Sequence, residues 1–117
     1  MARAIKWTTS AAQDLEEAAA FIARDSRFYA VALVREARLA ARNLKTLPER
    51  GRVVPELRSP NIRELFVKSY RLIYSFTPTT ITILAFVHGA RDLQALWGRR
   101  TSPSELNDSE EPDLAES

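Results

Sequence analysis

The sequence of 117 residues contains no cysteine, a single histidine and only three glycines. The lack of cysteine excludes a disulfide and a thiolate metal site, and one histidine argues against a zinc or iron centre. Gly51, Gly89 and Gly98 are too far apart to form a phosphate-binding glycine-rich loop. No serine lies in a turn typical of a nucleophile, so a Ser/His/Asp triad is not indicated. We therefore expect no cofactor and no metal.

Long hydrophobic runs are absent as well. No apolar stretch approaches the ~20 residues needed to cross a bilayer, and the chain opens with no signal-peptide pattern. Hydrophobic residues make up 45% and charged residues 27% of the chain, which is typical of a soluble globular protein. We expect one domain over residues 1–100, a cytoplasmic location and no membrane partner.

The net charge of +2 conceals an asymmetry between the body and the end of the chain. The segment 101–117 holds six of the 15 acidic residues and none of the 17 basic ones, so residues 1–100 carry a net charge of +8. Fourteen of the basic residues are arginine, which forms bidentate contacts with phosphate and carboxylate groups. This body suits an anionic partner, either a nucleic acid or an acidic protein segment, or it is an arginine-rich solvated surface. The acidic tail, which has no apolar period, is expected to be disordered.

The first 25 residues predict a strand followed by a helix. Residues 3–7 (R-A-I-K-W) alternate between polar and apolar side chains, which is typical of a short strand. Apolar residues then recur at helical spacing and predict an amphipathic helix over residues 10–25. Thr8, Thr9 or Ser10 can serve as the N-cap of this helix. Asp14 and Glu16 lie early in the helix, where the helix dipole favours acids.

A second helix is predicted from about Phe28 to Leu47, before Pro48 ends it. Its apolar face carries Leu33, Ala37, Ala40, Leu44 and Leu47. Only Asp25-Ser26 separates the two helices, so they should form an antiparallel αα-hairpin. Gly51 and Pro55 mark the following segment as a loop.

The second helix also carries a row of cations. Arg35, Arg38, Arg42 and Lys45 are spaced by three or four residues, which stacks them on one helix face. This face is either a basic stripe for an acidic or nucleic-acid partner or an ordinary solvated face.

Three strands are predicted over residues 62–67, 70–77 and 80–88. Their connections are too short for crossovers, so the strands must be antiparallel neighbours. Together with the first strand they predict an α+β fold, a small, mostly antiparallel sheet with the helical hairpin packed on one face. Leu93–Trp97 is expected to form a short terminal helix.

Polar residues interrupt these strands at places where a bare meander needs none. They are Arg63, Glu64, Tyr70, Arg71, Tyr74, His88, Arg91 and Asp92. Because side chains alternate along a strand, Arg71 should point to the opposite face from Tyr70 and Tyr74. An arginine cluster would suit phosphate recognition, but whether Arg63 and Arg91 converge with Arg71 depends on strand register. His88 is either a general acid–base residue or a structural hydrogen-bonding residue.

The order of elements and a series of short motifs resemble the ParE/RelE superfamily, the toxins of bacterial type II toxin–antitoxin modules. The motifs are W-T at 7–8, A-x-x-D-L at 11–15, P-x-x-G-R at 48–52, R-E-L at 63–65, Y-R-L-I-Y at 70–74 and V-H-G-A-R-D-L at 87–93. The resemblance covers about residues 4–97, whereas the tail from residue 101 has no counterpart in the family pattern.

The superfamily has two functional branches, and the resemblance favours the ParE-like branch. RelE-like toxins cleave mRNA in the ribosomal A site, and the resemblance would place two of their arginines on Arg71 and Arg91, with Arg63 as a third candidate. Glu64 stands where a lysine would be expected, and Trp97 stands where a tyrosine would be expected. The motifs are more similar to those of ParE-like toxins, which are associated with inhibition of DNA gyrase. We therefore expect no catalytic residues.

The resemblance also implies a cognate antitoxin as partner in a hetero-oligomer, with DNA gyrase as the target, or alternatively the ribosome and mRNA. A further alternative is a non-toxic module that only binds an antitoxin. An acidic, partly disordered partner would fold onto the basic body with a helix in the hairpin groove and a strand at the sheet edge. The candidate residues for antitoxin or target binding are Arg63, Glu64, Tyr70, Arg71, Tyr74, His88, Arg91, Arg35, Arg38 and Arg42.

Two of these expectations have an alternative. The arginines of the meander either anchor a partner or form structural salt bridges to Glu64 or Asp92. The acidic tail either solvates the chain or folds back on the basic body and mimics part of the antitoxin.

Overall fold

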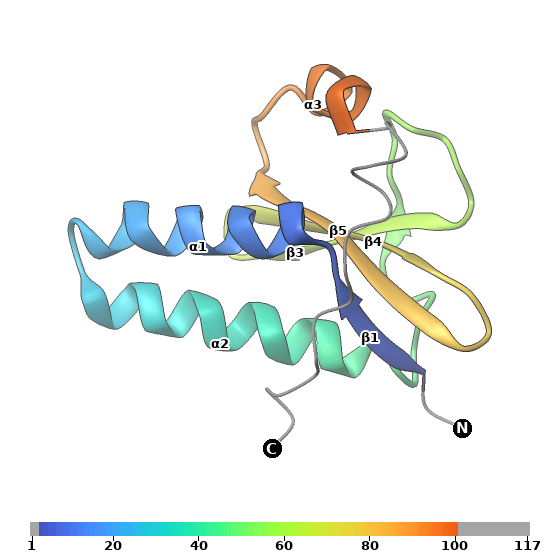
Figure 1. Cartoon of the computed structure of the whole chain (residues 1–117), viewed down its shortest axis with the longest axis horizontal. Helices are drawn as coiled ribbons and strands as arrows, with labels where there is room; N and C mark the ends of the chain where they lie inside the picture. The colour runs from blue at the N-terminus through green and yellow to red at the C-terminus, as the bar shows by residue number, and fades with distance from the viewer. Residues whose placement is uncertain (1–2, 101–117) are drawn as a thin grey trace.

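The structure, a computed structural model, describes residues 3–100, which contain three helices and one five-stranded sheet (Figure 1). In chain order the elements are β1 (Ala4–Trp7), α1 (Thr9–Ala23), α2 (Arg27–Asn43), β2 (Arg52–Val53), β3 (Ile62–Val67), β4 (Tyr70–Phe76), β5 (Thr80–His88) and α3 (Leu93–Arg100). This architecture confirms the predicted α+β fold with its N-terminal strand, helical hairpin and antiparallel meander. The predicted disordered tail lies outside the described residues.

The strands are ordered β1-β5-β4-β3-β2 across the sheet. β3, β4 and β5 pair in antiparallel fashion as predicted, and β1 adds to the outside of β5 in parallel. β2 was not predicted, because residues 52 and 53 belong to a segment read as a loop. Two residues are too few to show an alternating pattern, and they form a strand only because β3 lies beside them, with Arg52 opposite Glu64 and Val53 opposite Arg63.

α1 begins one residue earlier and ends two residues earlier than predicted. The Thr8 hydroxyl accepts a hydrogen bond from the Ala11 N–H at 3.0 Å and caps the helix, as the choice of Thr8, Thr9 or Ser10 anticipated. Ser26 caps α2 in the same way, because its hydroxyl accepts from the Tyr29 N–H at 3.2 Å. The Ser26 cap ends the short connection between the two helices.

α2 ends at Asn43, earlier than the predicted end at Leu47. Leu33, Ala37 and Leu44 are buried as expected, but Leu47 is 58% exposed and belongs to no buried face. The prediction for Leu47 was therefore wrong. Leu47 precedes Pro48, and a residue before proline is disfavoured in helical geometry, so the chain leaves the helix before it reaches Leu47.

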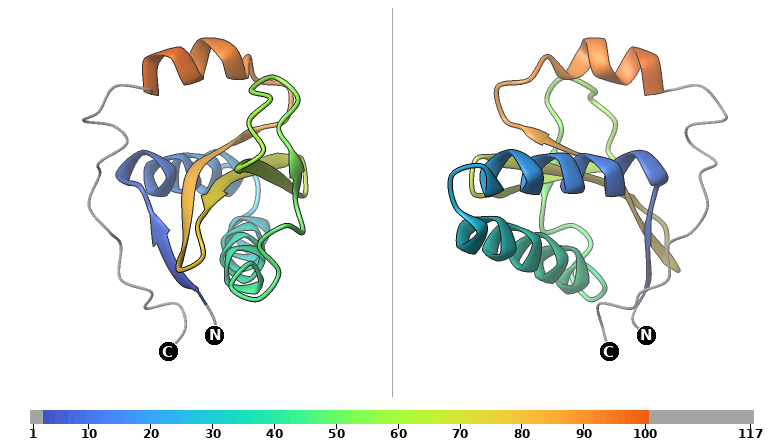
Figure 2. Two further views of the ribbon diagram at one scale, coloured as in Figure 1. Left: turned by 90° about the vertical axis from the view of Figure 1, so that its right-hand side faces the viewer. Right: turned by 60° about the vertical axis from the view of Figure 1, so that its left-hand side comes forward.

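The sheet has an apolar core on each face. The α1–α2 hairpin packs on one face, against residues that include Leu72, Tyr74 and Phe86. On the other face, Ile73, Ala85 and Val87 pack against Val54 and the leucines of α3. Figure 2 shows the strands between α2 and α3. No helix among residues 3–100 is long and apolar enough to cross a membrane.

Asp14 has a different role from the helix-dipole role that the sequence suggested. It does not lie in the first turn of α1 but on its buried side, where it accepts a hydrogen bond from the Phe86 N–H at 3.0 Å. β1 pairs with β5 only as far as Ile83, so at Phe86 β5 has β4 on one side and no strand on the other. Asp14 takes the place of that strand and also binds Arg100 at the end of α3 at 2.6 Å. This ion pair links α1, β5 and α3.

Candidate functional site

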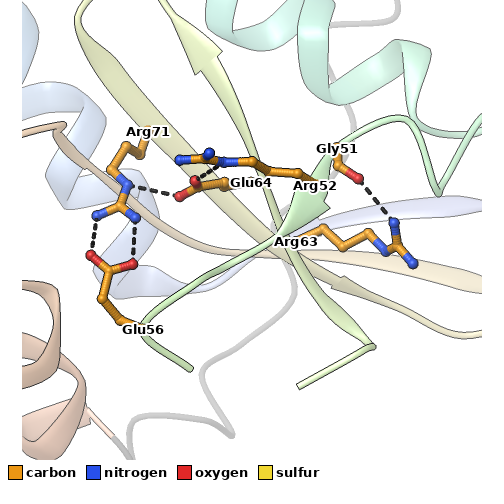
Figure 3. A network of polar contacts seen from close by, with 6 residues as sticks. All are labelled: Gly51, Arg52, Glu56, Arg63, Glu64 and Arg71. Carbon is orange, nitrogen blue, oxygen red and sulfur yellow. Dashed lines mark hydrogen bonds and ion pairs between the residues drawn. The ribbon is translucent and has the colours of Figure 1, made fainter. Parts of the chain in front are cut away.

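Four charged side chains between residues 52 and 71 form a continuous network. Arg71 of β4 donates from Nε to Glu64 of β3 at 2.7 Å, and from Nη1 and Nη2 to the Glu56 carboxylate at 3.0 and 2.7 Å. Arg52 of β2 donates to the other oxygen of Glu64 at 2.6 Å. Figure 3 shows Glu56 and Glu64 on two sides of the Arg71 guanidinium. All three donor nitrogens of Arg71 are therefore engaged.

The charges of the network are compensated within it, and its central pair is buried. The Glu64 side chain is fully buried and the Arg71 side chain is 5% exposed, while Arg52 and Glu56 reach solvent. The hydrogen bonds from Arg71 hold the pKa of Glu56 below its ordinary value, and the hydrogen bond to Glu56 raises the pKa of Arg71. Two arginines and two carboxylates together carry no net charge, and their mutual attraction offsets the desolvation penalty of burying Arg71 and Glu64.

Arg63 lies on the opposite face of β3 from this network. This orientation follows from the alternation of side chains along a strand, since Arg63 is adjacent to Glu64. Its Nη1 donates to the Gly51 carbonyl at 3.0 Å, and its guanidinium lies 5.8 Å from the centre of the Phe76 ring. Figure 3 shows it directed toward Gly51 and away from Arg71. Arg63 and Arg71 therefore do not converge on one site.

Tyr74 is fully buried and serves the loop that follows α2. Its hydroxyl donates to the Pro48 carbonyl at 2.7 Å and accepts from the Gly51 N–H at 2.9 Å. Burial raises the pKa of this hydroxyl. Tyr70 is half-buried on the same face, as predicted, and its ring stacks on Phe86 with 5.1 Å between the ring centres. Arg71 points to the other face, which confirms the predicted alternation.

His88 is the last residue of β5 and Arg91 lies in the segment before α3, and both are exposed. The Nδ1 atom of His88 accepts a hydrogen bond from the Ala90 N–H at 3.2 Å, and its ring contacts the edge of Tyr70. Asp92 accepts from the Ala95 N–H at 3.1 Å and so starts α3. Of the two acids offered as structural partners for the arginines, Glu64 forms an ion pair with Arg71, whereas Asp92 forms none of the ion pairs found among residues 3–100.

The described residues contain no buried polar side-chain atom without a partner. Trp97, at the position considered for a catalytic tyrosine, is partly buried and packs against the core beneath α3. The buried polar groups of the meander therefore bind one another within the chain, and none of them is left unpaired for a substrate.

An open, mostly apolar groove lies on the α1–α2 hairpin instead. We call it the hairpin groove, and its central part has a volume of about 400 Å³. The lining is formed largely by small residues from both helices: Ala19, Ala20, Ala23, Arg27, Ala30, Val31, Val34 and Arg35. Small side chains allow another helix to approach closely, so this surface suits a helical segment.

Two further hollows adjoin the central part of the hairpin groove. Toward β1, a hollow of about 240 Å³ shares Ala19 and Val34 with the central part and reaches Trp7 and Arg38. Along α2, a hollow of about 520 Å³ shares Arg27, Val31 and Arg35 with the central part and includes Phe28, which is 76% exposed. The three parts form a continuous track along the hairpin.

The predicted basic stripe borders this track. Arg35 lines the central part and Arg38 lines the hollow near β1. Arg42 follows on the same side of α2 by helical spacing, whereas Lys45, predicted on the same face, lies beyond the end of α2. The sequence analysis expected both these cations and a groove on the hairpin, but it did not identify the residues that line the groove. The signal for it was the run of alanines around α1 together with the exposed aromatic residues Phe21 and Phe28 near the hairpin connection.

Comparisons with known proteins agree with this geometry. The sequence matches none of the curated proteins. Its fold is similar to a solved structure of the chromosomal ParDE system from P. aeruginosa, with a TM-score of 0.60 and 20% identity over 74% of this chain and 95% of that one. It is also similar to a chain of the RelBE2 toxin–antitoxin complex from Mycobacterium tuberculosis, with a TM-score of 0.52 and 24% identity over 75% of this chain and 99% of that one.

The sequence itself carries the stronger evidence. Residues 5–93 match the family model of the ParE toxin of type II toxin–antitoxin systems. This match runs from the second residue of β1 through both helices of the hairpin and the other four strands, and it ends at the first residue of α3. It also includes both the charged network and the hairpin groove. The chain therefore belongs to the ParE toxin family of the ParE/RelE superfamily.

Proposed function

We propose that this toxin inhibits DNA gyrase, and thereby replication, by binding it, and that a cognate antitoxin neutralises the toxin. The observation that carries the non-enzymatic part is the state of Arg71. The guanidinium that a ribonuclease would direct at a phosphate is buried and bound to Glu64 and Glu56. A cation whose charge is already compensated contributes little to stabilising a developing negative charge.

The ribosome-dependent ribonuclease is the alternative, and the other candidate residues give it little support. Arg63 points away from Arg71, and His88 accepts a backbone hydrogen bond. Trp97 has an indole N–H that neither accepts nor releases a proton at neutral pH. Arg91 is exposed and remains the candidate most accessible to RNA. One exposed arginine without a proton-transfer partner is a poor basis for phosphodiester cleavage.

The hairpin groove supports the antitoxin as partner. The two solved structures are described as a ParDE system and as a toxin–antitoxin complex, so an antitoxin is the partner to expect here. The alanines and valines of the groove fit an amphipathic helix with apolar residues at i, i+3, i+4 and i+7. Arg35 and Arg38 beside the groove favour acidic residues on the flank of that helix.

Controlled expression in bacterial cells tests the target. We expect growth arrest with a DNA-damage response and gyrase-dependent DNA breaks, because the toxin would act on the enzyme that cuts and reseals DNA. Rapid translation arrest with mRNA cut at codon-related positions would instead establish the ribonuclease. Growth without arrest would favour the remaining alternative, a non-toxic module that only binds an antitoxin.

A further inference from the structure

The hairpin groove carries cations that have no acidic partner within the described part of the chain. Arg27 and Arg35 line its central part, and Arg38 lines the hollow near β1. None of the three forms an ion pair with another of residues 3–100. Among those residues Glu16 is the one acid in the two linings, so this surface keeps an excess of positive charge.

Apolar side chains lie among these cations. Val31 in the central part is 53% exposed, and the hollow near β1 is walled by Ala12, Ala19 and Val34. Exposed apolar surface that is rimmed by charged residues is typical of a docking site. The groove therefore suits a segment in which an apolar side chain lies between acidic residues.

A segment of that composition follows α3 in the same chain. Residues 101–117, the acidic tail, contain six acids, no basic residue and the two leucines Leu106 and Leu114. Leu106 lies between Glu105 and Asp108. The acidic tail also lies outside residues 5–93, which match the family model. It thus offers an intramolecular partner for the groove.

The end of α3 places the start of the acidic tail beside α1. Arg100 binds Asp14 with 2.6 Å between Arg100 Nη2 and Asp14 Oδ1. Ala12 and Glu16 are each two residues from Asp14, about 200° around the helix, so the hollow near β1 opens on the other side of α1. Half the circumference of a helix about 10 Å across is about 16 Å, and six extended residues span about 20 Å. Leu106 can therefore reach this hollow.

We propose that the acidic tail binds the hairpin groove of its own chain, with Leu106 in the hollow near β1 and acids beside Arg35 and Arg38. Attachment to α3 makes this binding intramolecular, so contacts that are individually weak suffice to hold the tail. The hairpin groove is also the expected antitoxin site, and the tail therefore competes with the antitoxin and lowers its apparent affinity. The competition rests on the proposed function, whereas the contact between tail and groove does not.

A spin label in the full chain tests this contact. The chain has no cysteine, so the variant Ser109→Cys can be labelled with a nitroxide at one place only. At low salt we expect the label to broaden the NMR methyl signals of Ala12, Ala19 and Val34, because the groove holds the tail beside them. The broadening should weaken as the ionic strength rises, since salt screens the attraction between exposed charges.

Two charge reversals in the labelled chain separate the hairpin groove from a general attraction to the basic body. Arg35→Glu/Arg38→Glu should abolish the broadening, whereas Arg50→Glu/Arg58→Glu, which reverses two exposed charges outside the groove, should leave it unchanged. Both variants should keep their thermal unfolding temperature, because none of the four arginines forms an ion pair with another of residues 3–100. Broadening that is equal in the two variants, or absent before either reversal, overturns the proposal.

Neutralising the acidic tail measures the competition. All six of its acids are replaced by their amides in the full chain. A tail that occupies the groove about nine-tenths of the time lowers the antitoxin affinity about tenfold, so the neutralised variant should bind purified antitoxin about tenfold more tightly at low salt. An unchanged affinity, in a chain whose label contacts the groove, overturns the competition and with it the hairpin groove as antitoxin site. Loss of the label contact overturns the binding of the tail and leaves the proposed function standing.

Discussion

Arg71 and Glu64 form a buried ion pair between two neighbouring strands, with 2.7 Å between Arg71 Nε and Glu64 Oε1. The pair exists because β3 and β4 are in a register that places Phe66 opposite Arg71, so Glu64 and Arg71 are diagonal neighbours on one face. Glu56 and Arg52 complete the network from the loop after β2 and from β2 itself. Residues that appear to be an active site in the sequence thus hold the edge of the sheet together.

The first prediction concerns the buried carboxylate. Replacing Glu64 with glutamine keeps the volume but removes the charge that two arginines share, so the free energy of unfolding should fall by about 3 kcal/mol. Urea unfolding of the purified protein measures this change. The double variant Glu64→Leu/Arg71→Met should recover part of the loss, since it leaves no unpaired charge in the buried part of the network. Equal stability of Glu64→Gln and the wild type would contradict a stabilising role for the network.

The second prediction is a pH dependence at Glu56. Its pKa is held below the ordinary value of 4.5 in the folded protein, mainly by the hydrogen bonds from Arg71. A lowered pKa in the folded state means that Glu56 stabilises the protein fully above about pH 4.5 and that this stabilisation is lost as the pH falls through the folded value. The stability difference between the wild type and Glu56→Gln should therefore be constant from pH 7 to about pH 5 and then shrink.

Urea unfolding across that pH range checks the second prediction. Glu16→Gln on the exposed side of α1 serves as a control for the loss of one carboxylate. A gap between the wild type and Glu56→Gln that is the same at pH 3 and pH 7 would refute the linkage.

The third prediction concerns Gly51, where backbone and side chains approach closely. A Cβ atom at this position would lie 2.5 Å from the Glu64 carbonyl oxygen and 2.7 Å from Tyr74 Oη. Gly51→Ala should therefore destabilise the protein by about 2 kcal/mol or more, because the loop must move off β3 and the bond to Tyr74 is lost. Gly98→Ala in α3 is the matched control, since a Cβ there meets no atom within 4 Å. In a helix that change should be neutral or stabilising, by up to about 1 kcal/mol.

Thermal unfolding of the two alanine variants decides the third prediction. We expect Gly51→Ala to unfold at a lower temperature than the wild type and Gly98→Ala at an equal or higher one. The reverse order would show that the contact between the loop and β3 is not tight.

The fourth prediction tests the cations of the hairpin groove. The double charge reversal Arg35→Glu/Arg38→Glu should weaken binding of the cognate antitoxin by about tenfold or more at low salt, with a smaller effect at high salt. Calorimetric titration with the purified antitoxin measures both affinities. Arg99→Glu on α3 reverses an exposed charge away from the groove and should leave the affinity unchanged. Antitoxin binding that is insensitive to the first variant would move the interface elsewhere.

Much of the fold could be predicted from local pattern. Helical spacing of alanines and leucines and alternation in three strands are properties of neighbouring residues, so they are visible without any tertiary contact. The errors lie where a distant partner decides. β2 depends on β3, and Asp14 binds the Phe86 N–H because β1 does not extend along β5 as far as Phe86. The early end of α2 is instead a local effect of Pro48.

The candidate site shows the same limit more sharply. The sequence identified Glu64, Arg71 and Tyr74 as unusual for a meander, and all three are indeed placed by specific bonds. It could not tell that Arg71 binds two carboxylates. Nor could it tell that Arg63, three residues before the β3 residue paired with Arg71, lies on the other face of the sheet and binds Gly51. The arginines of α2 were found by spacing, but the groove they border requires both helices of the hairpin.

The sequence by itself determined the elements, their order, the excess of positive charge over residues 1–100 and the resemblance to the toxin superfamily, because these depend on composition, short-range periodicity and motifs. Only the tertiary structure decided which polar residues are engaged within the chain and which surfaces remain open. Strand register and helix packing decide whether an arginine has a carboxylate neighbour or solvent, and both are set by contacts between residues far apart in the chain.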